Sequence, residues 1–264
     1  MTALSPYPKL PCPFPLRPGT DDEVVWHCVV EANEYRLPER FRPDDIVLDL
    51  GAHIGVFSHL ALERGSRRVE AYEAEPGNAA RARANLAPWG DAVAVHQSAV
   101  WRSDRGPETL HFTASNDPGS SGGGNVFFLD HGAPVSAVPF DSVVRDLTAR
   151  HGRSIRFLKI DVEAAEFPIL LTSSTLRLVD EIAGEFHEAG GERDPHVIPA
   201  WSRVDGYPRF TIEVLAQRLR RRGFEVWWVR FDGTNQGLFF ATRVSWPRWF
   251  AGRLRALVRR IFQR

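Results

Sequence analysis

The chain has 264 residues, of which 43% are hydrophobic and 25% charged, and its 33 basic side chains equal its 33 acidic ones in number. This composition is typical of a globular protein with one sizeable α/β domain, and zero net charge gives no overall field to attract nucleic acid. Two cysteines are too few for a disulfide framework or a zinc site. We therefore expect a cytoplasmic protein without a secretory signal or a membrane span.

The first 43 residues are predicted to form a proline-rich arm and a lid helix. Six prolines lie between Pro6 and Pro18, which favours an extended chain. From Asp21 to Tyr35 apolar residues recur at helical spacing, and Asp21 and Asp22 suit the N-cap and first turn of a helix. Two roles are open for this helix and for the stretch Asn33-Glu34-Tyr35-Arg36: covering the edge of the following sheet, or direct contact with a bound cofactor.

A glycine turn within residues 45–58 organises the chain. A short apolar run ends in Asp49, Gly51 permits the positive φ of a tight turn, and Gly55 lets the following helix pack closely. A turn of this kind between a buried strand and a helix places a nucleotide-sized ligand at the carboxyl edge of a parallel sheet. A turn with a purely structural role is the alternative.

The residues around the turn indicate the class of cofactor. A second predicted strand, residues 68–73, ends in Glu73, where an acid can bind the two hydroxyls of a ribose. A dinucleotide fold requires Gly-x-Gly-x-x-Gly to hold a pyrophosphate, but His53 occupies the second glycine position and Asp49 brings a negative charge. Both features favour a cationic cofactor without phosphate, and S-adenosylmethionine fits best.

Three sequence blocks resemble the FkbM family of S-adenosylmethionine-dependent methyltransferases: Asp49-Leu50-Gly51-Ala52-His53-Ile54-Gly55, Tyr72-Glu73-Ala74-Glu75-Pro76 and Leu158-Lys159-Ile160-Asp161-Val162-Glu163-Ala164-Ala165-Glu166. The resemblance extends over residues 21–243. Ala164 stands where the family usually has glycine, and Glu73, rather than Glu75, matches the family's ribose-binding acid. The resemblance implies S-adenosylmethionine as cofactor and S-adenosylhomocysteine as product. The cofactor site that it implies contains Asp49, Gly51, His53, Gly55, Glu73, Ala74, Ser98, Ala99 and Asp161.

The remaining elements predict one α/β domain over residues 44–243. Strands are expected at 92–96, 155–160 and 179–186, and a helix over 210–222 precedes a hairpin of 225–231 with 237–242. Two further strands, 109–112 and 126–129, are expected to flank a Gly- and Ser-rich loop that either selects the acceptor or is an idle hairpin loop. The expected fold is the class I methyltransferase fold: a Rossmann-like seven-stranded sheet, mostly parallel, with a C-terminal antiparallel hairpin that dinucleotide folds lack.

Candidate catalytic residues fall at the ends of the fourth and fifth strands. Methyl transfer to a hydroxyl needs an acceptor held in line with the methyl group and a base that takes the proton. Asp161, Glu163, Glu185 and His187 follow these strands, and Lys159 alternates with Asp161 and so faces the same side. The structural alternatives are a buried Lys–Asp pair, a packing histidine, and acids in the first turn of a helix. A divalent metal such as Mg²⁺ could also bind here, but no spacing is diagnostic and no metal is assigned.

The resemblance favours O-methylation of a small-molecule natural product, a sugar or a glycan. N- or carboxyl methylation and a cofactor-binding scaffold without activity are the alternatives, and the sequence has no Asn-Pro-Pro-Tyr-like segment of the kind used on bases in nucleic acid. The segment 244–264 is basic, with apolar residues at helical spacing. Through residues 246–264 it could contact an anionic membrane or a partner, making the protein membrane-peripheral; packing on its own domain or in a homodimer is the alternative.

Overall fold

The computed structural model describes residues 11–117, 119–194 and 196–244. The predicted basic helix over 246–264 lies outside the described residues, as do residues 1–10 of the proline-rich arm. Within the described ranges, no helix has the length and apolar character needed to cross a membrane.

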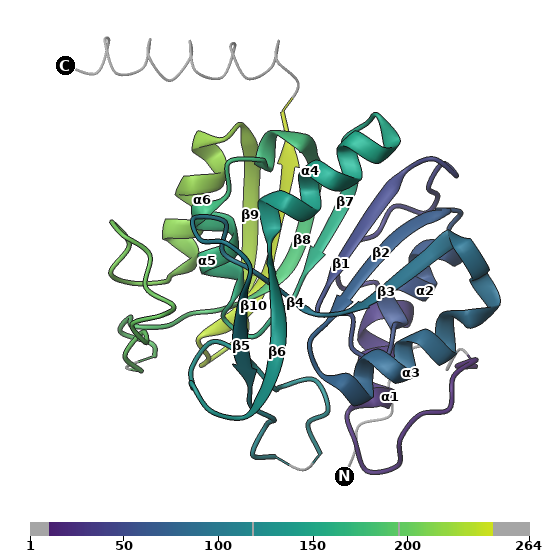
Figure 1. Ribbon diagram of the computed structural model, residues 1–264, viewed down its shortest axis with the longest axis horizontal. Helices are drawn as coiled ribbons and strands as arrows, with labels where there is room; N and C mark the ends of the chain where they lie inside the picture. The colour runs from purple at the N-terminus through teal and green to yellow at the C-terminus, as the bar shows by residue number, and fades with distance from the viewer. Residues whose placement is uncertain (1–10, 118, 195, 245–264) are drawn as a thin grey trace.

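A seven-stranded sheet forms the centre of the protein (Figure 1). Its strands are β1 (Ile46–Leu50), β2 (Arg68–Glu73), β3 (Val93–Gln97), β7 (Ile155–Ile160), β8 (Val179–His187), β9 (Phe224–Arg230) and β10 (Gln236–Arg243). They lie in the order β3-β2-β1-β7-β8-β10-β9, and β10 runs antiparallel to both of its neighbours while the other pairs are parallel. The predicted sheet, including its closing hairpin, is confirmed.

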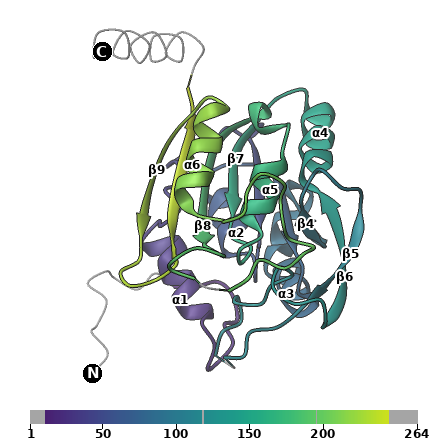
Figure 2. The same cartoon turned by 90° about the vertical axis from the view of Figure 1, so that its left-hand side faces the viewer.

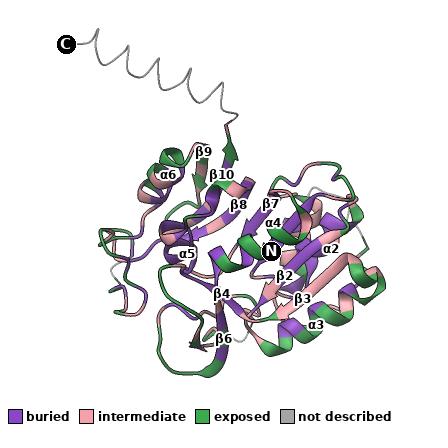
Figure 3. Cartoon of the chain, turned by 45° about the horizontal axis from the view of Figure 1, so that its top comes forward, coloured by how far each residue is buried: buried purple, intermediate pink, exposed green. Residues whose placement is uncertain are grey.

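Helices cover both faces of this sheet (Figures 1 and 2). One face carries α1 (Asp22–Trp26), the π-helical turn η1 (His27–Glu31), α2 (Val56–Glu63) and α3 (Pro76–Leu86); the other carries α4 (Phe140–His151), α5 (Glu166–Thr172) and α6 (Ile212–Arg221). Alternate residues of β1 enter different cores, since Val47 packs with α2 and Leu48 packs on the opposite side. This two-sided burial is why the strand sequences are continuously apolar. Figure 3 shows the buried strands between helices with exposed outer faces.

A second, three-stranded sheet differs from the prediction. It consists of β4 (Ala99–Trp101), β6 (Ala133–Pro139) and β5 (Glu108–Phe112), with β6 in the middle. The expected strand over 126–129 is wrong: this segment forms bends, and only Thr113 and Asn125 pair, in an isolated bridge. Its apolar residues reflect burial instead, because Phe127 is fully enclosed in the core of the domain.

The N-terminal helix is shorter than its periodicity predicts. The helical run ends at Glu31, and Asn33 takes a left-handed conformation with φ 48°, which stops any continuation to Tyr35. Asp21 occupies the N-cap position without capping the helix; its carboxylate instead accepts a hydrogen bond from the Ser121 backbone N–H at 3.0 Å. The polar residues at this helix start therefore serve a contact far along the chain.

The glycine turn between β1 and α2 requires its two glycines. Gly51 has φ 76°, and a Cβ there would lie 1.8 Å from the backbone oxygen of Asp161. Gly55 has φ 91° at the N-cap of α2, and a Cβ there would lie 2.9 Å from a methyl carbon of Leu86 in α3. The first glycine allows β1 and β7 to end side by side, and the second allows the two helices to pack closely.

Candidate active site

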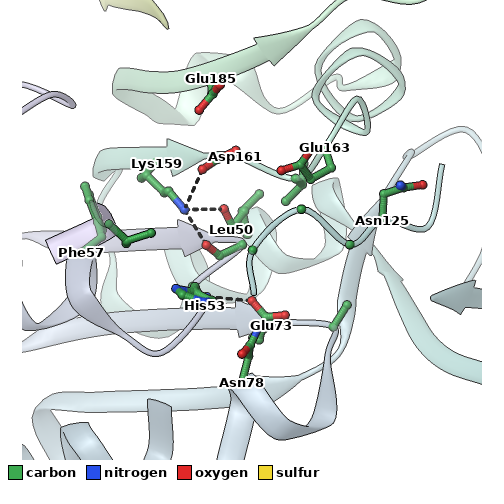
Figure 4. Close-up of a pocket in the computed structure, with 18 of the residues that line it drawn as sticks. Leu50, His53, Phe57, Glu73, Asn78, Asn125, Lys159, Asp161, Glu163 and Glu185 are labelled. Atoms are coloured by element: carbon green, nitrogen blue, oxygen red, sulfur yellow. Dashed lines mark hydrogen bonds and ion pairs between the residues drawn. The ribbon is translucent and has the colours of Figure 1, made fainter. Parts of the chain in front are cut away.

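A cavity of about 630 Å³ opens at the carboxyl ends of β1, β2, β7 and β8 (Figure 4). It lies where the chain leaves β1 for β2 on one side and where β7 borders β1 on the other, which is the switch point at which open α/β sheets bind ligands. Its walls come from the glycine turn, the strand ends, the α1–η1 segment and the loop that precedes β6. The carboxylate-bearing lining residues are Asp21, Glu34, Glu73, Asp161, Glu163 and Glu185.

Glu73 defines one end of this cavity. The His53 backbone N–H donates to its Oε2 at 2.7 Å, and the Glu75 backbone N–H donates to its Oε1 at 2.8 Å. Burial raises the pKa of Glu73 to about 7, although these two hydrogen bonds oppose the rise. Glu75, the alternative ribose acid, instead caps α3 by accepting hydrogen bonds from the backbone N–H groups of Gly77 and Asn78. Of the two acids, Glu73 is the one that faces the cavity.

The structure brings most of the predicted cofactor residues to the cavity. Gly51, His53, Glu73, Ala74, Ser98, Ala99 and Asp161 line it. Asp49 and Gly55 do not. Asp49 is fully buried beneath the turn, where Ser58 Oγ donates to its Oδ2 at 2.7 Å, and Gly55 serves helix packing. We therefore assign Asp49 and Gly55 to support of the glycine turn rather than to the direct contact with the cofactor that the sequence predicts.

Lys159 connects the turn to the end of β7. Its Nζ donates to the backbone oxygens of Gly51 at 2.5 Å and Leu50 at 3.3 Å, and it lies 3.5 Å from Asp49 Oδ1 and 3.9 Å from Asp161 Oδ2. Burial acts to lower its pKa, but the three carboxylates of Asp49, Asp161 and Glu73 prevail and raise it. The ammonium is therefore a fixed positive charge at the base of the cavity. Lys159 and Asp161 lie on the same side of β7, as their alternation in the sequence predicts.

A coupled group of three carboxylates and one imidazole forms the other end. His187 Nδ1 lies 3.3 Å from Glu166 Oε1, and its Nε2 lies 3.4 Å from Glu163 Oε2 and 3.6 Å from Glu185 Oε1. Burial opposes the charged imidazole, but the surrounding carboxylates raise the pKa of His187 well above its usual value. Burial in turn raises the pKa of Glu163 to about 7 and that of Glu185 to about 8. Glu163 and Glu185 can therefore exchange protons near neutral pH.

These residues also have the donor types of a divalent-metal site. Asp161, Glu163 and His187 each place one ligand atom within 4.8 Å of the others. Donor types and proximity alone do not identify a metal site, so we assign no metal to it.

A cluster of polar side chains joins three segments of the chain beside the cavity. Ser121, in the loop before β6, donates through its Oγ to Asp21 and lies 2.9 Å from both Asp22 Oδ1 and His53 Nε2. Arg17 donates to Asp22 at 2.7 Å and to His53 Nε2 at 2.9 Å. Burial lowers the pKa of His53 to about 4, so Nε2 of its neutral ring accepts the hydrogen bond from Arg17. We call Arg17, Asp21, Asp22, His53 and Ser121 the latch, because they join the lid helix, the glycine turn and the loop.

Some residues of the site have only a weak signal in the sequence. Glu34 and Tyr35, in the turn after η1, line the cavity and lie in the stretch 33–36, for which cofactor contact is one of two open roles. Asn125 lines the cavity from the Gly- and Ser-rich loop. Glu166 does not line the cavity but reaches His187 from the start of α5. Glu166 lies in the third sequence block, where the sequence predicts an acid that caps the following helix. Its Oε1 does accept the Val162 backbone N–H at 2.8 Å, so it caps the turn and orients the histidine at once.

The residues present fit S-adenosylmethionine and disfavour a dinucleotide. Among the described lining residues there are six carboxylic acids, one lysine and no arginine, so the cavity lacks the cluster of basic side chains that would favour a pyrophosphate. Glu73 has two oxygens at the edge of the site for a ribose diol, and His53 Nδ1 is a buried ring nitrogen without a hydrogen-bond partner in the described part of the chain. Together with the strand order, this site defines the class of protein: an S-adenosylmethionine-dependent methyltransferase with the class I fold.

The family follows from comparison with known proteins. The chain matches the model of the methyltransferase FkbM domain over residues 49–226, more than half of its length, and it belongs to this family.

The individual relatives share only a low sequence identity with this chain. The AMB antimetabolite synthetase AmbE of Pseudomonas aeruginosa is 28% identical over 253 residues, an alignment that covers 80% of this chain and 11% of AmbE. The chain thus spans about a tenth of the length of this curated relative. The crystal structure of the methyltransferase FkbM from Methylobacillus flagellatus KT is 14% identical and covers 76% of this chain and 44% of that chain, with a TM-score of 0.44. The crystal structure of the precorrin-6y C5,15-methyltransferase from Geobacter metallireducens GS-15 is 14% identical. It covers 87% of this chain and 92% of that chain, with a TM-score of 0.43.

Proposed function

We propose that the protein transfers a methyl group to a hydroxyl of a small-molecule natural product or a sugar. The observation that carries this proposal is the division of one cavity into a ribose-acid end at Glu73 and a proton-accepting end at Asp161, Glu163, Glu185 and His187. A hydroxyl is a poor nucleophile until its proton is removed, so an acceptor hydroxyl needs such groups beside it. The name of AmbE, an antimetabolite synthetase, supports a natural product as acceptor.

The chain's own residues have three tasks in this proposal. Bound S-adenosylmethionine supplies an electrophilic methyl group on a positively charged sulfur. Glu73 and the glycine turn bind and orient the nucleoside part, and Asp161 orients the reacting centre from the end of β7. Glu185 takes the hydroxyl proton from its ionised form, which His187 stabilises from 3.6 Å away, and its raised pKa makes it a competent base near neutral pH.

The size of the cavity supports a small acceptor. About 630 Å³ is within the range of pockets that enclose drug-sized ligands, and it must hold the cofactor and the acceptor together. The latch restricts entry from the side of the lid helix, so a large acceptor would have to present one protruding hydroxyl. A single sugar or a compact natural product meets this limit.

Calorimetric titration with S-adenosylmethionine, S-adenosylhomocysteine and NAD tests the cofactor. We expect saturable binding of the first two to the wild type, its loss in Glu73→Ala, and no binding of NAD. Transfer of labelled methyl to a panel of alcohols, amines and carboxylic acids then tests the acceptor, with Glu185→Gln as the variant that should slow transfer to alcohols most. Binding of NAD alone would overturn the methyltransferase proposal, and transfer only to amines or acids would overturn O-methylation.

A further inference from the structure

A strained turn outside the family-matched region carries a residue into the active site. Asn33 and Arg36 have φ values of 48° and 53°, in the left-handed region that L residues rarely adopt. Asn33 exchanges side-chain hydrogen bonds with the backbone of Leu37 at 3.1 and 3.2 Å, and Arg64 donates to the Leu37 oxygen at 2.6 Å. Backbone strain of this kind persists only where the surroundings hold it, and it is concentrated at functional sites. The residue that this turn places is Tyr35.

The ring of Tyr35 fills the space beneath the end of β7. It is 3% exposed, it meets the ring of Phe57 edge-on at a centroid distance of 5.8 Å, and Lys159 Nζ lies 5.6 Å from its centroid. Its hydroxyl donates to Asp161 Oδ2 at 2.9 Å. Burial raises the pKa of Tyr35 well above its usual value, so the hydroxyl keeps its proton and remains a donor.

Two donors compete for the same oxygen of Asp161. Tyr35 contacts Oδ2 directly, whereas Lys159 Nζ lies 3.9 Å from it. Oδ1 of Asp161 has no hydrogen bond from any residue in the described ranges, and the side chain lines the cavity. Without the tyrosine hydroxyl, no side-chain hydrogen bond given for the described residues would hold Oδ2, and the carboxylate would be free to turn toward the ammonium 3.9 Å away.

We propose that Tyr35 is a positioning residue of the active site, which holds Asp161 by Oδ2 so that Oδ1 stays available to the cationic centre of the cofactor and to the acceptor. The inference rests on the proposed function in one respect, because it needs Asp161 beside the reacting atoms. It also implies that residues 33–37, before the start of the family-matched range, belong to the catalytic unit.

The test compares two ligands that differ at the reacting centre. Sinefungin carries an amine where S-adenosylmethionine carries its methyl sulfonium, whereas S-adenosylhomocysteine is uncharged there. The ratio of their dissociation constants, measured by calorimetry, therefore reports on a carboxylate beside that centre. The variants are Tyr35→Phe, Asp161→Asn and, as a matched control, Tyr207→Phe, which lies outside the cavity lining. Thermal unfolding of each variant is measured in parallel.

We expect Tyr35→Phe to bind S-adenosylhomocysteine within about twofold of the wild type. Its preference for sinefungin, given by the ratio of the two dissociation constants, should fall about tenfold, which corresponds to the free energy of one hydrogen bond to a charged group. Asp161→Asn should lose at least as much, and Tyr207→Phe should lose nothing. Asn33→Ala, which frees the turn, should shift the ratio in the same direction as Tyr35→Phe.

Each other outcome has one meaning. A wild-type ratio in Tyr35→Phe, together with a reduced ratio in Asp161→Asn, would overturn the role of Tyr35 and leave the proposed function standing. A wild-type ratio in Asp161→Asn would overturn both the place of Asp161 and the role of Tyr35. Failure of the wild type to bind either ligand would overturn the proposed function itself.

Discussion

The backbone N–H of His53 donates a 2.7 Å hydrogen bond to Oε2 of Glu73, so the glycine turn and the end of β2 form one unit. The same carboxylate is buried, and burial raises its pKa to about 7. Glu73 is therefore held in place before any ligand arrives, and its charge depends on pH in the neutral range.

The first prediction concerns the pH dependence of cofactor binding. A ribose diol donates two hydrogen bonds best to an ionised carboxylate, so binding should favour the charged form of Glu73 and lower its pKa. The affinity for S-adenosylhomocysteine should therefore increase from about pH 6 to about pH 8, with proton release on binding. Calorimetry in two buffers of different ionisation enthalpy measures both. Glu73→Gln should bind about tenfold more weakly and with a flat profile; a flat profile in the wild type would contradict the assignment.

The sequence predicts the centre of the site better than its walls. Glu73 and Asp161 were found because strand ends and a local glycine pattern are properties of neighbouring residues. The sequence marks the segments 33–36 and 113–125 but not the contacts of Tyr35 and Ser121, whose partners Asp161 and His53 lie 126 and 68 positions away in the chain. No local pattern reports such contacts, and the strained turn at Asn33 has the sequence of an ordinary helix end.

The same limit explains the errors in the fold. The run 126–129 has the composition of a strand, yet it forms a loop in which only Val126 and Phe127 are buried, because β6 already pairs with β5. Asp49 lies in a block that resembles the family's cofactor site, but alternation along β1 turns it toward α2 and Ser58. In both cases the tertiary partner, which the sequence does not show, decides the outcome.

The second prediction concerns the buried pair of Lys159 and Asp49. In Lys159→Met, Asp49 would keep only the hydrogen bond from Ser58 within a fully buried site. Removing one partner of a buried ion pair costs about 3–5 kcal/mol, so we expect the free energy of unfolding to fall by this amount in urea titrations. The double variant Asp49→Asn/Lys159→Met should recover part of the loss, because the unpaired charge is gone. A single-variant loss below about 1 kcal/mol would contradict a charged pair.

The third prediction concerns acid stability through Asp141. Its carboxylate, in the first turn of α4, accepts hydrogen bonds from Ser173, Ser174 and Thr175 after α5. Burial alone would raise the pKa of Asp141, but the hydrogen bonds from Ser174 and Ser173 outweigh it and lower the pKa to about 2. Because the folded pKa is depressed, this contribution is complete above the ordinary value of 3.8 and is lost as pH falls toward 2.

Asp141→Asn should therefore lower the free energy of unfolding by about 1–3 kcal/mol at neutral pH, and the difference from the wild type should shrink below about pH 4. Chemical denaturation at several pH values measures this difference. The matched control is Asp104→Asn, whose carboxylate pairs with Arg102 but is 44% exposed, so its effect should stay below about 1 kcal/mol. Equal effects of the two substitutions would argue against the role of Asp141.

The last prediction concerns the latch. Ser121 holds the loop to Asp21, Asp22 and His53, and we expect the bound cofactor to leave past these contacts. Ser121→Ala removes the shared hydroxyl without touching the cavity floor, and we expect dissociation of S-adenosylhomocysteine to become about tenfold faster, since hydrogen bonds to charged groups are lost. A competition chase in stopped flow measures the rate. Ser115→Ala, in the same loop but outside the latch, should leave the rate unchanged. If both variants release the ligand at the wild-type rate, the latch is a structural contact and the cofactor leaves by the opposite side of the cavity.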